Sequence, residues 1–139
     1  MKITLERANH AVAFTCRNAD GQSVTADANA KVGGEGLGMR PMEMLLSALI
    51  SCSSIDIILI LKKMRIELSH YQVEVTGERA EGNPAPFTSI HLQFFIGKQD
   101  PLEQVEKAVA LGVEKYCSVG LSLHPDIEVR YTVTPIDHE

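Results

Sequence analysis

The feature that most constrains the fold of this 139-residue chain is a segment of almost unbroken apolar character from Pro41 to Leu61. Proline fits the first turn of a helix, because the N–H that it lacks has no partner there. From Pro41 onward apolar residues lie on nearly every face, and the segment ends at Lys62-Lys63-Met64-Arg65, a basic cluster that offsets the helix dipole. A helix that is apolar all round is typically buried, and we predict a central helix here.

The composition of this helix also indicates what surrounds it in the folded protein. Its longest apolar stretch, residues 44–61, is interrupted by the polar group at 51–54 and by Asp56, so we predict a buried helix rather than a membrane span. A 139-residue monomer has too little other chain to cover it fully, and helices packed on one face of a sheet need something on their other side. We therefore expect a homodimer with these helices between sheets. An unusually buried helix in a monomer is the alternative.

The rest of the chain reads as short strands and one further helix. Alternation of apolar and polar residues predicts strands at 2–8, 11–17, 22–28, 67–79, 87–97 and 127–134. Residues 29–40, with four glycines between Gly33 and Gly38, are predicted to form a flexible loop. Asp100-Pro101 is expected to cap a helix over residues 101–117. The predicted fold class is α+β, with antiparallel sheets around a long central helix, in a single domain over residues 1–139.

The net charge and the first residues of the chain indicate which partners and which cellular location to expect. The net charge is −5 and the basic residues are scattered, which argues against nucleic acid and anionic membrane as partners. The start of the chain, Met1 to Arg7, lacks the apolar region of a secretory signal, so we expect a cytoplasmic protein. Cytoplasmic cysteines are normally reduced, and three of them do not indicate a structural disulfide framework.

Two cysteines in unlike settings are the candidate reactive groups. Cys52 lies in the third turn of the long helix, too far from its start for the helix dipole to lower the pKa of the thiol. A reactive Cys52 therefore needs a cation from elsewhere, and Arg17, Arg40 and Arg79 are all candidates. A buried Cys52 that packs as a small hydrophobic residue is the alternative.

Two acidic residues and the two other cysteines are further candidates for a reactive site. Asp56 is one turn after Cys52, where a buried carboxylate would need an arginine partner. Glu43 is either part of the site or an ordinary first-turn acid. Cys117, at the end of the second predicted helix, suits a resolving thiol, whereas Cys16 is read as packing or surface. The histidines are scattered and no C-x-x-C is present, so we expect no metal site.

Three segments of this sequence resemble the OsmC/Ohr family of thiol-dependent hydroperoxide reductases, and the resemblance extends over most of the chain. The residues that carry it are Pro41-Met42-Glu43-Met44-Leu45 running into Ser51-Cys52, then Phe87-Thr88-Ser89-Ile90-His91-Leu92, and finally Tyr116-Cys117-Ser118-Val119. The order of strands and helices fits as well.

The resemblance implies an intertwined α+β homodimer with its active sites at the subunit interface. It implies that Cys52 is the peroxidatic cysteine, which forms a sulfenic acid with a hydroperoxide, and that Cys117 resolves it as a disulfide. Glu43 and Arg17 are the matches to the family's catalytic acid and arginine. Organic hydroperoxides would be the substrates, an external dithiol or lipoylated protein the reductant, and no cofactor would be needed.

The sequence departs from the family pattern at three points. Met42 stands directly after the proline, where the family has glutamate, and Glu43 follows one residue later. Arg17 is only a loose match for the family's arginine, and Ser118 follows the second cysteine where the family has proline. These departures leave two alternatives open: a small-ligand-binding or redox-sensing protein with little peroxidase turnover, and another thiol chemistry such as disulfide exchange or acyl transfer.

Overall fold

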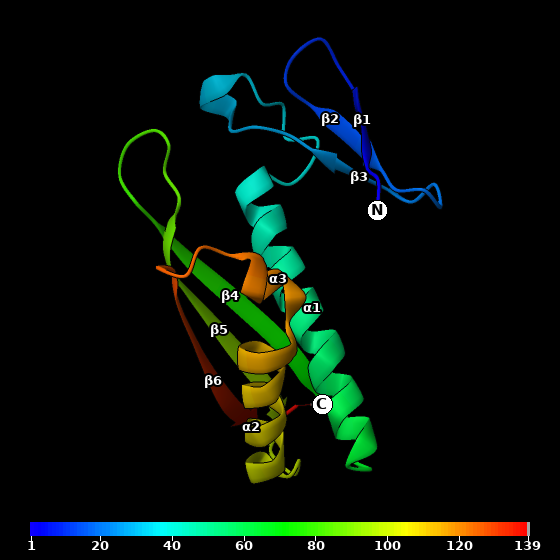
Figure 1. The fold of residues 1–139 in the computed structure, drawn as a ribbon, viewed down its shortest axis with the longest axis vertical. Coiled ribbons are helices and arrows are strands. Elements are labelled where there is room, and N and C mark those ends of the chain that lie inside the picture. Colours follow the sequence, from blue (N-terminus) through cyan, green and yellow to red (C-terminus); the bar gives the residue numbers. More distant parts are fainter. Residues whose placement is uncertain (139) are drawn as a thin grey trace. The chain divides into compact units, whose positions relative to one another are not determined.

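A computed structural model describes residues 1–138 and divides the chain into two compact units, of which the first ends at Leu45. The first unit is an antiparallel meander of β1 (Thr4–Arg7), β2 (Phe14–Arg17) and β3 (Ser23–Ala26), in that order across the sheet (Figure 1). Asparagine side chains hold both turns, since Asn9 Oδ1 accepts the N–H of Ala11 and Asn18 Oδ1 accepts that of Gln22. The three predicted strands are confirmed, although each is shorter than expected.

The glycine-rich segment of this unit is more ordered than the sequence suggested. It begins with a 3₁₀ turn, η1 (Ala30–Val32), and Gly33 and Gly36 adopt positive φ angles of 95° and 70°. The buried carboxylate of Asp27 accepts hydrogen bonds from the N–H groups of Glu35 and Leu37, at 2.9 and 3.1 Å. Most of the segment lies outside regular elements, as predicted, but the sequence did not reveal the backbone donors that the Asp27 carboxylate satisfies, and its flexibility stays a prediction.

The second unit contains a sheet of β4 (Tyr71–Arg79), β5 (Phe87–Gly97) and β6 (Glu128–Ile136), in that order. β4 and β5 are antiparallel, whereas β5 and β6 are parallel. The predicted all-antiparallel pairing was therefore wrong for this sheet: a helical connection between β5 and β6 returns the chain to the same end before it enters the next strand. Alternate residues of β5 are buried on the side that the helices cover: Ile90, Leu92, Phe94 and Ile96.

Helix α1 (Pro41–Lys63) begins in the first unit and continues through the second, confirming the long helix. Its buried residues recur every four positions, at Leu49, Ser53, Ile57 and Leu61. Residues 1–138 cover its other faces only in part, and Ile55, Ile58 and Leu59 are exposed. Among the described residues, α1 is the one helix long and apolar enough to cross a membrane, a test that core helices of soluble proteins also pass.

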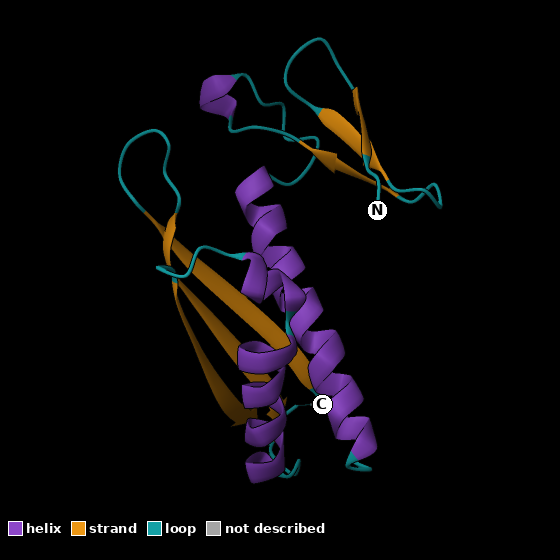
Figure 2. Cartoon of the chain, in the orientation of Figure 1, coloured by secondary structure: helices purple, strands orange, loops and turns teal. Residues whose placement is uncertain are grey.

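The second predicted helix, residues 101–117, is present but changes its winding within its length, and a further short helix follows it (Figure 2). α2 (Leu102–Leu111) continues into a π-helical turn, η2 (Gly112–Tyr116), and after Cys117 a short helix α3 (Ser118–Ser122) follows. The prediction that Asp100 caps this helix was wrong. Its carboxylate instead accepts hydrogen bonds from the N–H and hydroxyl of Ser69 and from the N–H of Gly97.

Candidate functional site

Cys52 lies half-buried in α1, directly before the fully buried Ser53. The Ser53 hydroxyl donates to the carbonyl of Leu49 at 2.9 Å, so that it needs no partner outside the helix. One position is 100° of rotation on an α-helix, and Cys52 is therefore turned away from the centre of the buried stripe. This placement leaves the Cys52 thiol partly accessible.

Cys117 lies in the irregular position between η2 and α3, with none of its surface exposed. Its Sγ is 3.9 Å from the Leu49 carbonyl oxygen, a weak S–H···O contact that joins it to α1. The N–H of Gly120 donates to the same sulfur at 3.3 Å, so the thiol acts as the N-cap of α3. Backbone groups of α1 and α3 thus fix the position of the Cys117 sulfur.

The structure brings Cys52 and Cys117 together, although they come from different elements. Burial raises the pKa of the Cys117 thiol, and the hydrogen bond with the neighbouring Cys52 side chain raises it further. The N–H groups of Gly120 and Val119 act in the opposite direction but do not outweigh burial. Both cysteines are free thiols. Two free thiols side by side are the first requirement for a reversible disulfide between them.

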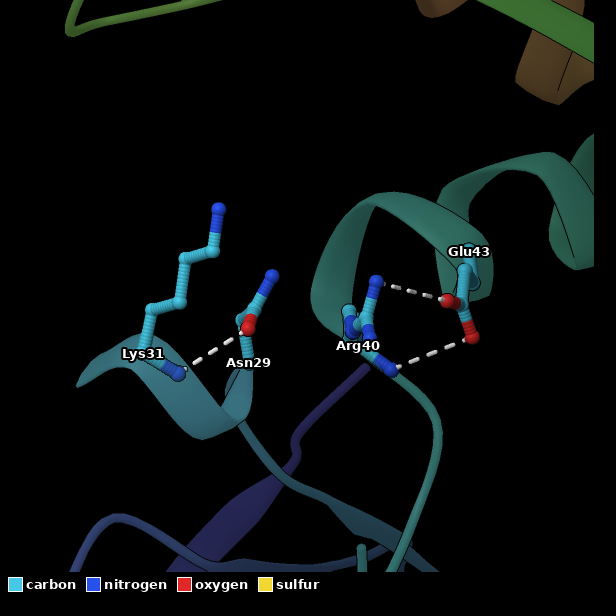
Figure 3. A network of polar contacts seen from close by, with 4 residues as sticks. All are labelled: Asn29, Lys31, Arg40 and Glu43. Carbon is cyan, nitrogen blue, oxygen red and sulfur yellow. Dashed lines mark hydrogen bonds and ion pairs between the residues drawn. The ribbon is translucent and has the colours of Figure 1, made fainter. Parts of the chain in front are cut away.

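The other predicted site residues, Glu43 and Arg17, belong to the first unit. Glu43 forms an exposed ion pair with Arg40 at 3.8 Å and accepts a long hydrogen bond of 3.5 Å from the Arg40 N–H (Figure 3). Arg17 ends β2 and lines a cavity of about 450 Å³ together with Cys16 and Met44. Glu43 is thus paired with Arg40, and the catalytic roles of Glu43 and Arg17 stay predictions. Figure 3 also shows Asn29, whose side chain caps the 3₁₀ turn by accepting the N–H of Lys31.

Two further candidates have settings that the sequence did not predict. The Arg79 guanidinium donates to the carbonyl of Ala85 at 2.7 Å, and so supports the loop between β4 and β5. Asp56 is half-buried rather than buried, and within residues 46–138 its carboxylate has no ion pair or hydrogen bond. The expected arginine partner of Asp56 is not present in that unit. Among residues 1–138, no three His, Cys, Asp or Glu side chains gather as metal ligands.

The backbone groups that hold Cys117 were not predictable from the sequence. The carbonyl of Leu49 and the N–H of Gly120 both contact Cys117, and Tyr131 donates from its hydroxyl to Glu114 of η2 at 3.1 Å. Glycine three residues after Cys117 was the one available signal, but cysteine is not a usual N-cap residue. The π-helical turn has no recognised sequence signature.

Comparisons with known proteins agree on one family. Residues 33–132 match the family model described as OsmC-like protein. Protein YhfA of Escherichia coli K12 is 37% identical over 120 residues, which are 86% of this chain and 87% of YhfA. The crystal structure of a hypothetical protein from Aquifex aeolicus VF5 is 30% identical, with a TM-score of 0.78 over 98% of this chain and 97% of that one. An organic hydroperoxide resistance protein OsmC from Legionella pneumophila shares the fold at 15% identity, with a TM-score of 0.71 over 96% and 97% of the two chains.

Proposed function

Because this chain belongs to the OsmC-like protein family, we propose that it is a cysteine-based thiol peroxidase that reduces organic hydroperoxides in defence against oxidative stress. The observation that carries the proposal is the adjacency of the free thiols of Cys52 and Cys117. A structural neighbour, the OsmC protein of Legionella pneumophila, is described as an organic hydroperoxide resistance protein.

In the proposed reaction, the half-buried Cys52 is the peroxidatic residue because a substrate can reach it. Its thiolate attacks the distal oxygen of the hydroperoxide, the O–O bond breaks, and the alkoxide takes up a proton to leave as an alcohol. Cys52 is then a sulfenic acid. Cys117 loses its proton and attacks the Cys52 sulfur, hydroxide leaves and is protonated to water, and a disulfide forms.

The cycle needs groups and partners beyond the two thiols. An external dithiol or a lipoylated protein reduces the disulfide by exchange and is itself oxidised to a disulfide. Glu43 and Arg17 are proposed to activate Cys52, with Arg40, the ion-pair partner of Glu43, as the competing cation. The working unit is proposed to be a cytoplasmic homodimer that needs no cofactor and binds neither nucleic acid nor membrane.

Mass spectrometry of the reduced protein after one equivalent of cumene hydroperoxide tests this function. We expect rapid formation of a Cys52–Cys117 disulfide, located by peptide mapping. Cys52→Ser should abolish turnover, whereas Cys117→Ser should allow one turnover or overoxidation of Cys52. Survival of both thiols in a folded wild-type protein would contradict the proposal.

One observation favours a small-ligand-binding protein as the second candidate. A cavity of about 580 Å³ lies within the second unit, lined mainly by apolar side chains at the end of α1 and the start of β4, among them Leu61, Ile66 and Tyr71. This volume lies within the range of small-molecule sites. Retention of both thiols after peroxide treatment, together with stabilisation by an apolar ligand, would move this candidate to first place.

A further inference from the structure

We propose that Gly112 is a positioning residue for the thiol pair: the hydrogen atom that serves as its side chain lets η2 approach α1 closely enough to hold Cys117 beside Cys52. The inference concerns the geometry of the two thiols, and its importance for turnover rests on the proposed function.

η2 and α1 approach each other closely at Gly112. A Cβ atom at this position would lie 2.5 Å from Cγ1 of Ile57 and 3.2 Å from the carbonyl oxygen of Ser53. Carbon atoms in contact normally lie about 3.5–4.0 Å apart. Ile57 is fully buried and Ser53 presents backbone, so neither has free space to move into. Any larger residue at position 112 must displace η2 from α1.

Backbone freedom, the usual reason for a glycine, does not apply at position 112. Gly112 has a φ of −64° and a ψ of −43°, which are ordinary helical values that every residue adopts without strain. Glycine is among the least favourable residues within a helix. Close approach to α1, rather than backbone freedom, is therefore what requires glycine here.

The contact at Gly112 and the contact at Cys117 lie one turn apart along α1. Gly112 faces Ser53 and Ile57, whereas Cys117, five residues later, contacts Leu49. On an α-helix a five-residue step is a rotation of roughly 140° beyond a full turn. A π-helical turn closes hydrogen bonds over five residues and so stacks such positions. Through this turn, the close approach of Gly112 to α1 also brings Cys117 close to α1.

The chain contains a matched control for this position. Gly120 also lies near the thiol, but a Cβ atom there would be 3.5 Å from Cys117 Sγ and 3.5 Å from Cδ1 of Leu49. Those are ordinary contact distances. Alanine at position 120 therefore adds the same methyl group beside Cys117 without forcing the two elements apart.

The test measures the equilibrium between the dithiol and the Cys52–Cys117 disulfide in buffers of reduced and oxidised dithiothreitol. We expect Gly112→Ala to shift the equilibrium toward the dithiol by roughly tenfold or more, since a displacement of about 1 Å costs up to about 100-fold in effective concentration. Gly120→Ala should stay within about twofold of wild type, because it makes an ordinary contact. A folded Gly112→Ala variant with the wild-type equilibrium would overturn the inference.

A double variant separates positioning from a general loss of stability. Ile57→Ala removes the atom that the new Cβ would strike. The dithiol–disulfide equilibrium of Gly112→Ala/Ile57→Ala should therefore lie close to that of Ile57→Ala alone. If Gly112→Ala by itself does not fold, the comparison of the double variant with Ile57→Ala decides the question. A tenfold difference between their equilibria would refute the positioning role of Gly112. Dithiothreitol requires no peroxide chemistry. An inert wild-type protein with the expected equilibria would therefore refute the proposed function and leave the positioning role intact.

Discussion

The thiols of Cys52 and Cys117 are neighbours but meet different surroundings. Cys117 has no exposed surface, and burial opposes the thiolate more strongly than the Gly120 and Val119 N–H groups favour it. Cys52 is half-buried and open to a reactant. This difference in burial agrees with the roles proposed above, in which the accessible thiol reacts first and the buried thiol second.

The pH dependence of alkylation should reveal the raised pKa of the buried Cys117 thiol. Because the pKa of the folded-state thiol lies above its usual 9.0, iodoacetamide should modify Cys117 in a Cys16→Ser variant with a midpoint above pH 9. The raised pKa stabilises the fold below pH 9, and this contribution is lost as the pH rises through the folded-state value. Burial is the main cause, so most of the shift should persist in Cys16→Ser/Cys52→Ser; its disappearance there would identify the neighbouring thiol as the cause.

At the scale of elements, the loop between β3 and α1 depends on one carboxylate. Hydrogen bonds from the N–H groups of Leu37, Glu35 and Ala28 hold the pKa of Asp27 below its usual 3.8. The stabilisation is therefore complete above about pH 3.8 and is lost as the pH falls through the lower folded-state value.

Amide hydrogen exchange at Glu35 and Leu37 measures this dependence. After correction for the intrinsic effect of pH on exchange, both amides should lose protection on acidification through the folded-state pKa of Asp27. Asp27→Asn should show the unprotected rates already at pH 7, with the amides of β5 unchanged as the internal control. Full protection in Asp27→Asn would show that the glycine backbone orders the loop without the carboxylate.

The elements that the sequence predicted well are those with a regular apolar period. The alternation in residues 87–97 located β5 to the residue, and the apolar run from Pro41 located α1. The failures lie where the backbone is irregular. The π-helical turn at Gly112–Tyr116 and the Asp27 loop depend on contacts between residues far apart in the chain, which local periodicity does not contain. The fold places Cys52 beside Cys117, which the sequence could not show, and the catalytic roles of both cysteines stay predictions.

At the scale of the whole molecule, the uncovered face of α1 is the main unexplained surface. Ile55 and Leu59 are 62% and 51% exposed, and they lie three and seven positions after Cys52. A second copy of the chain that covers this face would remove it from water, in accordance with the proposed homodimer.

Sedimentation of a charged variant tests the dimer. Burial of an unpaired carboxylate costs several kcal/mol, so Ile55→Asp/Leu59→Asp should weaken the dimer by at least about 100-fold and yield monomers at micromolar concentration. Leu102→Asp on α2, a matched change at a 37% exposed leucine, should remain dimeric. A dimer that survives the α1 substitutions would mean that the two copies meet elsewhere.

The parallel pairing of β5 with β6 also has a consequence for the order in which this protein folds. β4 and β5 are joined by a short loop and can pair early, whereas partners such as Ser89 and Glu128 are far apart in the chain, so their pairing costs more chain entropy. β6 comes after the other two strands in the chain and completes the sheet on the free side of β5. Until that strand docks, β5 presents an open edge and a row of buried-type side chains, and a nascent or truncated chain is most prone to aggregation during this interval.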